Sequence, residues 1–305
     1  MQSIAIFLIF LFSCSQSPNY YYKRGNSFFI NGDYYKALDM YSKAILIKPD
    51  FSQALVSRAL TYEKIGDKEK AKDDYIKAIS ADPKYLPAYN NIASILIESG
   101  LYSDALYYIN RALEIDPKYY YAFYNRGLLN YYAKNYKQSI DDLTSAINLN
   151  PKDIAYYYRA MAYYKNREFT NAISDLEKIK DLSSDIVYYQ LAKIKLENLD
   201  PSAINDINKA IGIKQEPSYY FLKSRIYVKL NNFNMAEESI NQAIKLSGAS
   251  KSSYLYYAGD IYLHSGNQEM ARKYYDMAIK VNPGSKDLYY NCLKKMKKTR
   301  RNGRK

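Results

Sequence analysis

The sequence is poor in the side chains that most enzymes use. Its 305 residues include one histidine, His264, and two cysteines, Cys14 and Cys292. A metal site needs several histidine, cysteine or carboxylate ligands, and a nucleophile needs a base beside it. Neither arrangement can be drawn from these residues, and the 11 glycines occur singly, which argues against a phosphate-binding loop. We therefore expect no enzyme, no metal, no cofactor and no small-molecule substrate, and we interpret His264 as an ordinary side chain near a turn.

Tryptophan is absent, whereas tyrosine occurs 38 times. Lysine, asparagine and isoleucine are also frequent, and such a composition is typical of an AT-rich genome. Tyrosine is also enriched at protein interfaces, because it offers rigid contact area together with a hydroxyl group. Composition alone leaves both interpretations open.

The apolar run at the N-terminus, Ile4 to Phe12, is short. A membrane-spanning helix takes about 20 apolar residues, so this run fits a signal peptide over residues 1–13 instead. Residues Leu11 to Cys14 resemble a bacterial lipobox. That resemblance implies lipid attachment to Cys14, a tether over 14–17, and a place in the bacterial cell envelope, with the outer membrane favoured. An uncleaved N-terminal anchor and a plain secreted protein are the alternatives.

The chain contains a repeat of 34 residues with a proline near the end of each unit. Each of four units carries two small residues, an alanine and the proline at fixed places: Gly25, Ala37, Ala44 and Pro49; Ala59, Ala71, Ala78 and Pro83; Ala93, Ala105, Ala112 and Pro117; Gly127, Ser139, Ala146 and Pro151. Four units in register exclude chance. They also exclude an ordinary helical bundle, which has no fixed period.

Each unit predicts two antiparallel helices. In the first unit, Tyr21 and Gly25 fall at helical spacing before a break at Gly32, and Tyr41 lies in a second helical stretch that Pro49 ends. Small residues allow the two helices to approach closely, while large ones fill the gaps between units. One hairpin cannot bury its apolar face alone, so the units must stack on each other.

The period, the small residues and the closing proline resemble the tetratricopeptide repeat (TPR) family. The resemblance implies an all-α superhelix, a TPR solenoid of about eight helix-turn-helix repeats with a C-terminal capping helix. The expected segments are the repeats 18–51, 52–85, 86–119, 120–152, 153–184, 185–216, 217–251 and 252–284, the capping helix 285–298, which would bury Cys292 as a small apolar group, and a disordered basic tail 299–305.

Two repeats depart from the pattern. The fifth lacks its closing proline, and we expect Asp181 to Ser184 to form a flexible joint. In the sixth, Leu199-Asp200-Pro201 is expected to shorten the turn between the helices. The acidic pairs Asp73-Asp74 and Asp141-Asp142 fall on second helices, where we expect a solvated face.

A partner-binding groove follows from the resemblance. In such solenoids, positions 2, 5, 9, 12 and 13 of the first helices face inward; we call these positions the groove face. The groove face carries Asn19, Tyr22, Asn26, Phe29 and Ile30 in the first repeat; Tyr121, Tyr124, Leu128, Tyr131 and Tyr132 in the fourth; and Ile154, Tyr157, Met161, Tyr164 and Lys165 in the fifth. Such a surface of tyrosine and aliphatic side chains suits a protein or peptide partner.

One specific partner is excluded by the residues. Some TPR co-chaperones grip the C-terminal carboxylate of heat-shock proteins with five lysine, asparagine and arginine side chains over three repeats. Only Asn26 matches that clamp, whereas Tyr22, Ser57, Pro87 and Asn91 stand at its other places.

The net charge of +13 is concentrated at the C-terminus. The last twelve residues supply eight positive charges, which leaves +5 (13 − 8) for the rest of the chain. Such a tail can bind anionic lipid, nucleic acid or an acidic protein, although a solvated tail that aids solubility is the favoured interpretation.

The sequence therefore predicts a non-catalytic scaffold that is anchored to an envelope membrane and binds a protein or peptide in its groove, with no nucleic acid expected. The alternative is a soluble intracellular scaffold that contacts nucleic acid through its basic tail.

Overall fold

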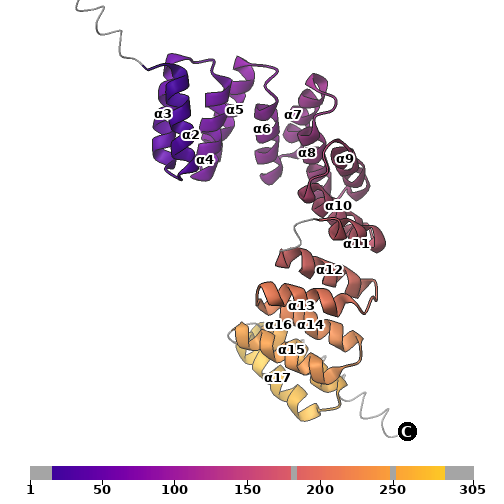
Figure 1. Cartoon of the computed structure of the whole chain (residues 1–305). Helices are drawn as coiled ribbons and strands as arrows, with labels where there is room; N and C mark the ends of the chain where they lie inside the picture. The colour runs from indigo at the N-terminus through magenta and orange to yellow at the C-terminus, as the bar shows by residue number, and fades with distance from the viewer. Residues whose placement is uncertain (1–15, 180–183, 248–251, 286–305) are drawn as a thin grey trace, which may run out of the picture. The chain divides into compact units, whose positions relative to one another are not determined.

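The computed structural model describes residues 16–179, 184–247 and 252–285. These residues form sixteen α-helices and a short 3-10 helix, and they contain no strand (Figure 1). The all-α repeat architecture predicted from the sequence is confirmed. The signal segment with Cys14, the capping helix beyond Ser285, Cys292 and the basic tail lie outside the described residues.

The helices form eight hairpins. The first helices are α2 (Pro18–Ile30), α4 (Ser52–Lys64), α6 (Leu86–Glu98), α8 (Tyr120–Tyr132), α10 (Asp153–Lys165), α12 (Asp185–Glu197), α14 (Pro217–Lys229) and α16 (Ser252–His264). The second helices are α3 (Tyr34–Ile47), α5 (Lys68–Ala81), α7 (Tyr102–Ile115), α9 (Tyr136–Leu149), α11 (Phe169–Glu177), α13 (Ala203–Ile213), α15 (Phe233–Leu246) and α17 (Gln268–Val281), followed by the 3-10 helix Pro283–Ser285.

Helices pack mainly against their neighbours in sequence. The two helices of a hairpin contact each other, and the second helix of one hairpin contacts the first helix of the next, as α3 does with α4 and α13 with α14. The chain divides into two compact units, residues 1–155 (unit 1) and 156–305 (unit 2). The apolar core is correspondingly a series of clusters, such as one from α4 to α8 in unit 1 and one from α12 to α14 in unit 2.

Local sequence determines where the helices begin and end. Ser17 caps α2 by accepting a hydrogen bond from the Tyr20 amide at 3.2 Å, and Pro18 occupies the first position, where no amide is needed. At the other end of the hairpin, Lys48 leaves the helical region with φ −131° ahead of Pro49.

The predicted small residues lie where the first helix crosses the second. A methyl group added to Gly25 would lie 2.5 Å from the ring of Tyr41, and one added to Gly127 would lie 2.6 Å from Cγ of Leu143. Ala59, at the same place in the second repeat, is fully buried. Interiors are close-packed, so these crossings leave no room for a larger residue.

The turn after each first helix has a left-handed residue at its centre. The amide that follows this residue closes the helix; for example, Asp33 donates to the carbonyl of Phe28 at 2.9 Å, as in a Schellman motif. Four turns use glycine and four use other residues, with φ between 56° and 86°: Gly32, Gly66, Gly100 and Gly266; Lys134, Arg167, Leu199 and Asn231.

The fifth and sixth hairpins depart from the regular geometry. Helix α11 has only 9 residues, whereas α3 has 14. Of the expected joint Asp181 to Ser184, only Ser184 is described, and it precedes α12. In the sixth hairpin, one residue fewer separates Ala192 from Ala203 than separates Gly25 from Ala37.

The turn of the sixth hairpin is nevertheless longer than predicted. Helix α13 begins only at Ala203, so residues 198–202 lie outside the helices, whereas residues 31–33 suffice in the first hairpin. The deletion is therefore absorbed by leaving Pro201 and Ser202 out of the second helix rather than by a tighter turn.

The acidic pairs on the second helices do not lie together on a solvated face, as the sequence had suggested. Asp73 is exposed, but Asp74 is only 2% exposed and accepts hydrogen bonds from Nε and Nη2 of Arg58 at 2.6 and 2.8 Å. Asp141 is likewise exposed, whereas Asp142 is buried. Asp74 and Asp142 can be buried because an arginine 16 residues upstream, on the facing helix, supplies the charge partner that burial requires.

This ion pair recurs in the array. Arg126 donates to Oδ1 of Asp142 at 2.6 Å, and Arg159 donates to Asp175 at 2.7 and 2.8 Å. Burial by itself lowers the pKa of Arg159, but the hydrogen bond and charge of Asp175 raise it above its usual value. Each pair ties the first helix of a hairpin to the second by charge as well as by packing.

We expect Gly127→Ala to destabilise unit 1 by about 1–3 kcal/mol, because the new methyl group meets Leu143 at the helix crossing. Helix propensity alone predicts the opposite sign. Gly212→Ala is the matched control: it also lies in a helix, nothing lies within 4 Å of the added methyl group, and a gain of up to about 1 kcal/mol is expected. Urea unfolding followed by circular dichroism measures both, and equal effects would contradict the crossing argument.

We expect stability to fall as the pH rises from about 10 to 12. Burial, with a smaller contribution from Tyr22, raises the pKa of Tyr41 from 10.0 to about 12. Because the folded pKa lies above the unfolded one, the contribution of Tyr41 is fully present below pH 10 and is lost as the pH approaches 12. Urea midpoints at a pH of about 9 and about 11.5 measure the loss. Tyr41→Phe is expected to reduce it, whereas Tyr35→Phe, at a position 77% exposed, is expected to leave it unchanged.

Candidate functional site

In the first repeat, the predicted groove residues Tyr22 and Asn26 are half-buried and contact the chain itself. The ring of Tyr22 lies 5.1 Å from that of Phe51, and Asn26 accepts a hydrogen bond from the hydroxyl of Tyr41 at 2.7 Å. Ile30, at the end of the same helix, is 82% exposed. The first contact joins the first hairpin to the start of α4, and the second ties α2 to α3 within the hairpin. Only part of this groove face is therefore open.

Helix α8 carries the densest group of tyrosines in unit 1. Tyr120 stacks on Tyr124 with ring centroids 6.0 Å apart, and Tyr121 lies edge-on to Tyr120 at 5.0 Å. Lys152 reaches over this group from the end of the repeat, 4.7 Å from the Tyr121 ring, and donates to its hydroxyl at 3.0 Å. Tyr121 is 40% exposed, so the group presents both an aromatic surface and a cation.

Within this group, the hydroxyl of Tyr120 is buried and has no hydrogen-bond partner among the described residues. Burial raises the pKa of Tyr120 to about 12, so the group stays a neutral phenol.

The other predicted residues of α8 and α10 differ in exposure. Leu128 and Tyr131 are half-buried, Tyr132 is 46% exposed, and Tyr131 and Tyr132 lie edge-on with centroids 5.5 Å apart. Tyr157 is half-buried next to Tyr158. Met161, in contrast, is only 7% exposed. Although the sequence placed it on the groove face, Met161 is part of the core and offers little to a partner.

In unit 2, Tyr164 belongs to a group of charged residues. Its hydroxyl donates to Oε1 of Glu197 at 2.7 Å, and the Nζ atom of Lys193 lies 5.3 Å from its ring centroid. Burial most of all, and then the positive charge of Lys165, lower the pKa of Lys193; Arg225 adds to this effect and Glu197 opposes it. The first helices α10, α12 and α14 therefore bring three cations and one carboxylate together.

The sequence analysis did not identify Lys193, Glu197 or Arg225. The signal was available, because these residues occupy positions 9 and 13 of the sixth repeat and position 9 of the seventh.

The described residues contain no group of three or more histidine, cysteine, aspartate or glutamate side chains that could hold a metal ion. His264 is exposed at the end of α16, where Nδ1 lies 2.7 Å from the carbonyl oxygen of Asp260. In the part of the chain that the structure describes, no helix combines the length and apolar character needed to cross a bilayer.

Solved structures with a similar fold include a tetratricopeptide repeat protein from Parabacteroides merdae, with 20% sequence identity and a TM-score of 0.57 over 87% of this chain and 100% of that one. A chain of the APC/C hetero-tetramer Cut9–Hcn1 is 16% identical, with a TM-score of 0.56 over 85% of this chain and 52% of that one, so the present chain spans about half its length. Yeast Tom70 is 18% identical, with a TM-score of 0.52 over 95% of this chain and 66% of that one. These likenesses concern the fold alone.

No curated protein matches the sequence. Models of the tetratricopeptide repeat match residues 18–51, 52–85, 86–119, 124–185, 217–250 and 252–285. These matches cover most of the chain and both of its units, and the helices they span form hairpins of the expected kind. The protein therefore belongs to the tetratricopeptide repeat family.

Proposed function

We propose that the protein is a non-catalytic scaffold that binds a protein or peptide partner on its groove face and is held at a bacterial envelope membrane by lipid on Cys14. The observation that carries the binding part is the exposed aromatic surface of α8. Tyr121 and Tyr132 are 40% and 46% exposed, although tyrosines elsewhere in the array, such as Tyr41 and Tyr75, fill its core. Rigid aromatic side chains on an accessible surface are typical anchors of protein interfaces.

The regular hairpins support this proposal. Ala37, Tyr41 and Ala44 of α3 are buried between helices, whereas Tyr121 and Tyr132 of α8 remain exposed, so these two tyrosines are available to a partner. The similarity to known structures also supports a role in binding proteins, because the Cut9–Hcn1 structure contains a similar chain within a hetero-tetramer. A scaffold needs only an exposed surface that binds a partner, and we assign no reaction to this protein.

The membrane part of the proposal rests on residues 1–17 alone. The short apolar run, followed by Leu11-Phe12-Ser13-Cys14, has the order expected of a lipidated signal segment. A single acyl chain binds membranes only weakly, so stable anchoring takes more than one chain. Lipid attachment to both the thiol and the new amino group of Cys14 would meet this need.

We expect the native chain to incorporate a fatty-acid analogue when it is expressed in a bacterial host, and to remain with the membrane fraction. Cys14→Ser removes the acceptor thiol and is expected to abolish labelling, whereas Cys292→Ser is the matched control and is expected to label normally. Labelling is measured by in-gel detection after extraction of free lipid. An unlabelled native chain in the soluble fraction would contradict the anchor and favour the intracellular alternative.

We expect Tyr121→Ser combined with Tyr132→Ser to remove most of the partners that cross-link to the full chain in cells. The loss follows from removing two exposed anchors, each of which typically contributes about tenfold or more in affinity. Tyr35→Ser, on the second helix α3 and 77% exposed, is the control for loss of a surface tyrosine. Quantitative mass spectrometry of cross-linked complexes measures the outcome. If the double variant and the control retain the same partners, the groove face of unit 1 is not the binding surface.

A further inference from the structure

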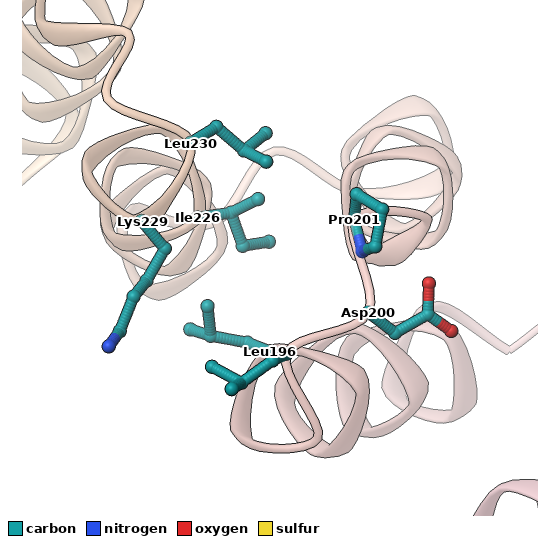
Figure 2. A pocket seen from close by; sticks show the side chains of 7 residues that line it. Leu196, Asp200, Pro201, Ile226, Lys229 and Leu230 are labelled. Atoms are coloured by element: carbon teal, nitrogen blue, oxygen red, sulfur yellow. The ribbon is translucent and has the colours of Figure 1, made fainter.

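A small apolar notch lies between the sixth and seventh hairpins (Figure 2). Leu196 of α12 and Ile226 of α14 form one side, Leu230 closes the end of α14, and Pro201 lies opposite them on the turn before α13. Leu199 completes the lining and is 74% exposed. The notch thus opens at the surface of the array.

The notch lies beside the turn that carries the deletion in the sixth repeat. In the regular hairpins the second helix begins directly after a three-residue turn, as α3 does after residues 31–33. In the sixth, Pro201 and Ser202 remain outside α13, and Pro201 lines the notch together with Ile226 and Leu230. The volume of the notch is about 110 Å³. A cavity of about 150 Å³ holds a benzene molecule, so the notch has room for one aliphatic side chain.

A larger hollow of about 410 Å³ adjoins the notch and shares Leu196, Leu199 and Lys229 with it. The additional lining includes Arg167, Arg225 and Glu197. Three cations therefore face one carboxylate across the hollow. That carboxylate is already engaged, because Glu197 accepts a hydrogen bond from Tyr164 at 2.7 Å.

Arg225 differs from the arginines that tie the hairpins together. Arg58, Arg126 and Arg159 each pair with a buried aspartate. Arg225 is half-buried, yet no carboxylate in residues 16–179, 184–247 or 252–285 forms an ion pair with it. A half-buried guanidinium is costly to leave unpaired, so this side chain is available to an incoming anion.

The pKa of Lys193 supports the same conclusion. Burial and the nearby Lys165 lower it, with a further effect of Arg225. Positive charges therefore outnumber negative ones around Lys193, and a carboxylate bound there would reduce the electrostatic repulsion between these cations.

We propose that unit 2 contains a docking site for an acidic peptide segment, in which one aliphatic side chain enters the notch and flanking carboxylates pair with Arg225 and Lys193. The proposal rests on the proposed scaffold function and names the chemistry of its partner.

Other anionic occupants fit less well. The notch matches a single side chain and is too small for an acyl chain, which argues against a lipid. A nucleic acid offers no aliphatic side chain to fill the notch. The C-terminal tail of the same chain carries eight basic residues and no acidic residue among its last twelve, so it has the wrong charge.

The test uses the full-length chain in detergent and labelled synthetic peptides, measured by fluorescence anisotropy. The probe is a nine-residue peptide with a central leucine flanked by glutamates. Two matched peptides carry glutamine in place of every glutamate, or serine in place of the leucine. We expect the first peptide to bind at least about tenfold more tightly than either control, and its affinity to fall as salt is raised.

Two variants locate the site. Arg225→Gln is expected to weaken the acidic peptide about tenfold or more, whereas Lys209→Gln, the same charge change on the exposed face of α13, is expected to leave binding unchanged. Leu199→Gly removes a wall of the notch and is expected to abolish the preference for leucine over serine. Its fold is expected to be at least as stable as the native one, because Leu199 has a left-handed φ of 58°.

The result that overturns the proposal is equal affinity for the glutamate and glutamine peptides, no binding of any peptide, or binding that Arg225→Gln does not weaken. Displacement of the peptide by phosphatidylglycerol in mixed detergent micelles, or by single-stranded DNA, at comparable concentration would also overturn it. Failure of the scaffold function is a separate outcome: it is seen when the native full-length chain cross-links to no partner in cells, whatever the peptides do.

Discussion

The close crossing of the two helices in each hairpin is the constraint on which the rest of the structure depends. Where Gly25 meets Tyr41 and Gly127 meets Leu143, no further atom fits between the helices. This contact fixes the pairing of the helices, and the buried arginine–aspartate pairs, such as Arg159 with Asp175, add a charge match to it. This contact buries one side of each helix, and the first helices keep a partly exposed face, as Tyr121 and Tyr132 show on α8.

The two units use that exposed face differently. In unit 1, the groove face of α8 carries aromatic rings, and Lys152, which lies over the rings of Tyr120 and Tyr121, hydrogen bonds to Tyr121. In unit 2, the cations Lys193 and Arg225 lie among tyrosines, with one carboxylate, Glu197, nearby. Helix hairpins of one kind therefore present surfaces of different chemistry, and a scaffold of this kind can hold partners of more than one character.

Much of the fold could be predicted from the sequence because it depends on spacing. The 34-residue period and the small residues at the crossings require no knowledge of tertiary structure. The burial of Asp74 was missed because its partner Arg58 lies 16 residues away on the facing helix. Met161 occupies a groove position but is 7% exposed, since position in a repeat does not determine how deeply a side chain sits. The notch could not be predicted from the sequence, because the late start of α13 at Ala203 and the side chains that line the notch depend on tertiary packing.

The left-handed turns vary systematically along the chain. Glycine occupies this place in the first three hairpins and the last, whereas Lys134, Arg167, Leu199 and Asn231 occupy it in the four between. A residue with a side chain costs about 1–2 kcal/mol more than glycine in this conformation, and asparagine somewhat less. Repeat arrays open in segments rather than all at once. The backbone strain in these four interior turns therefore lowers the cost of opening their hairpins to a protease.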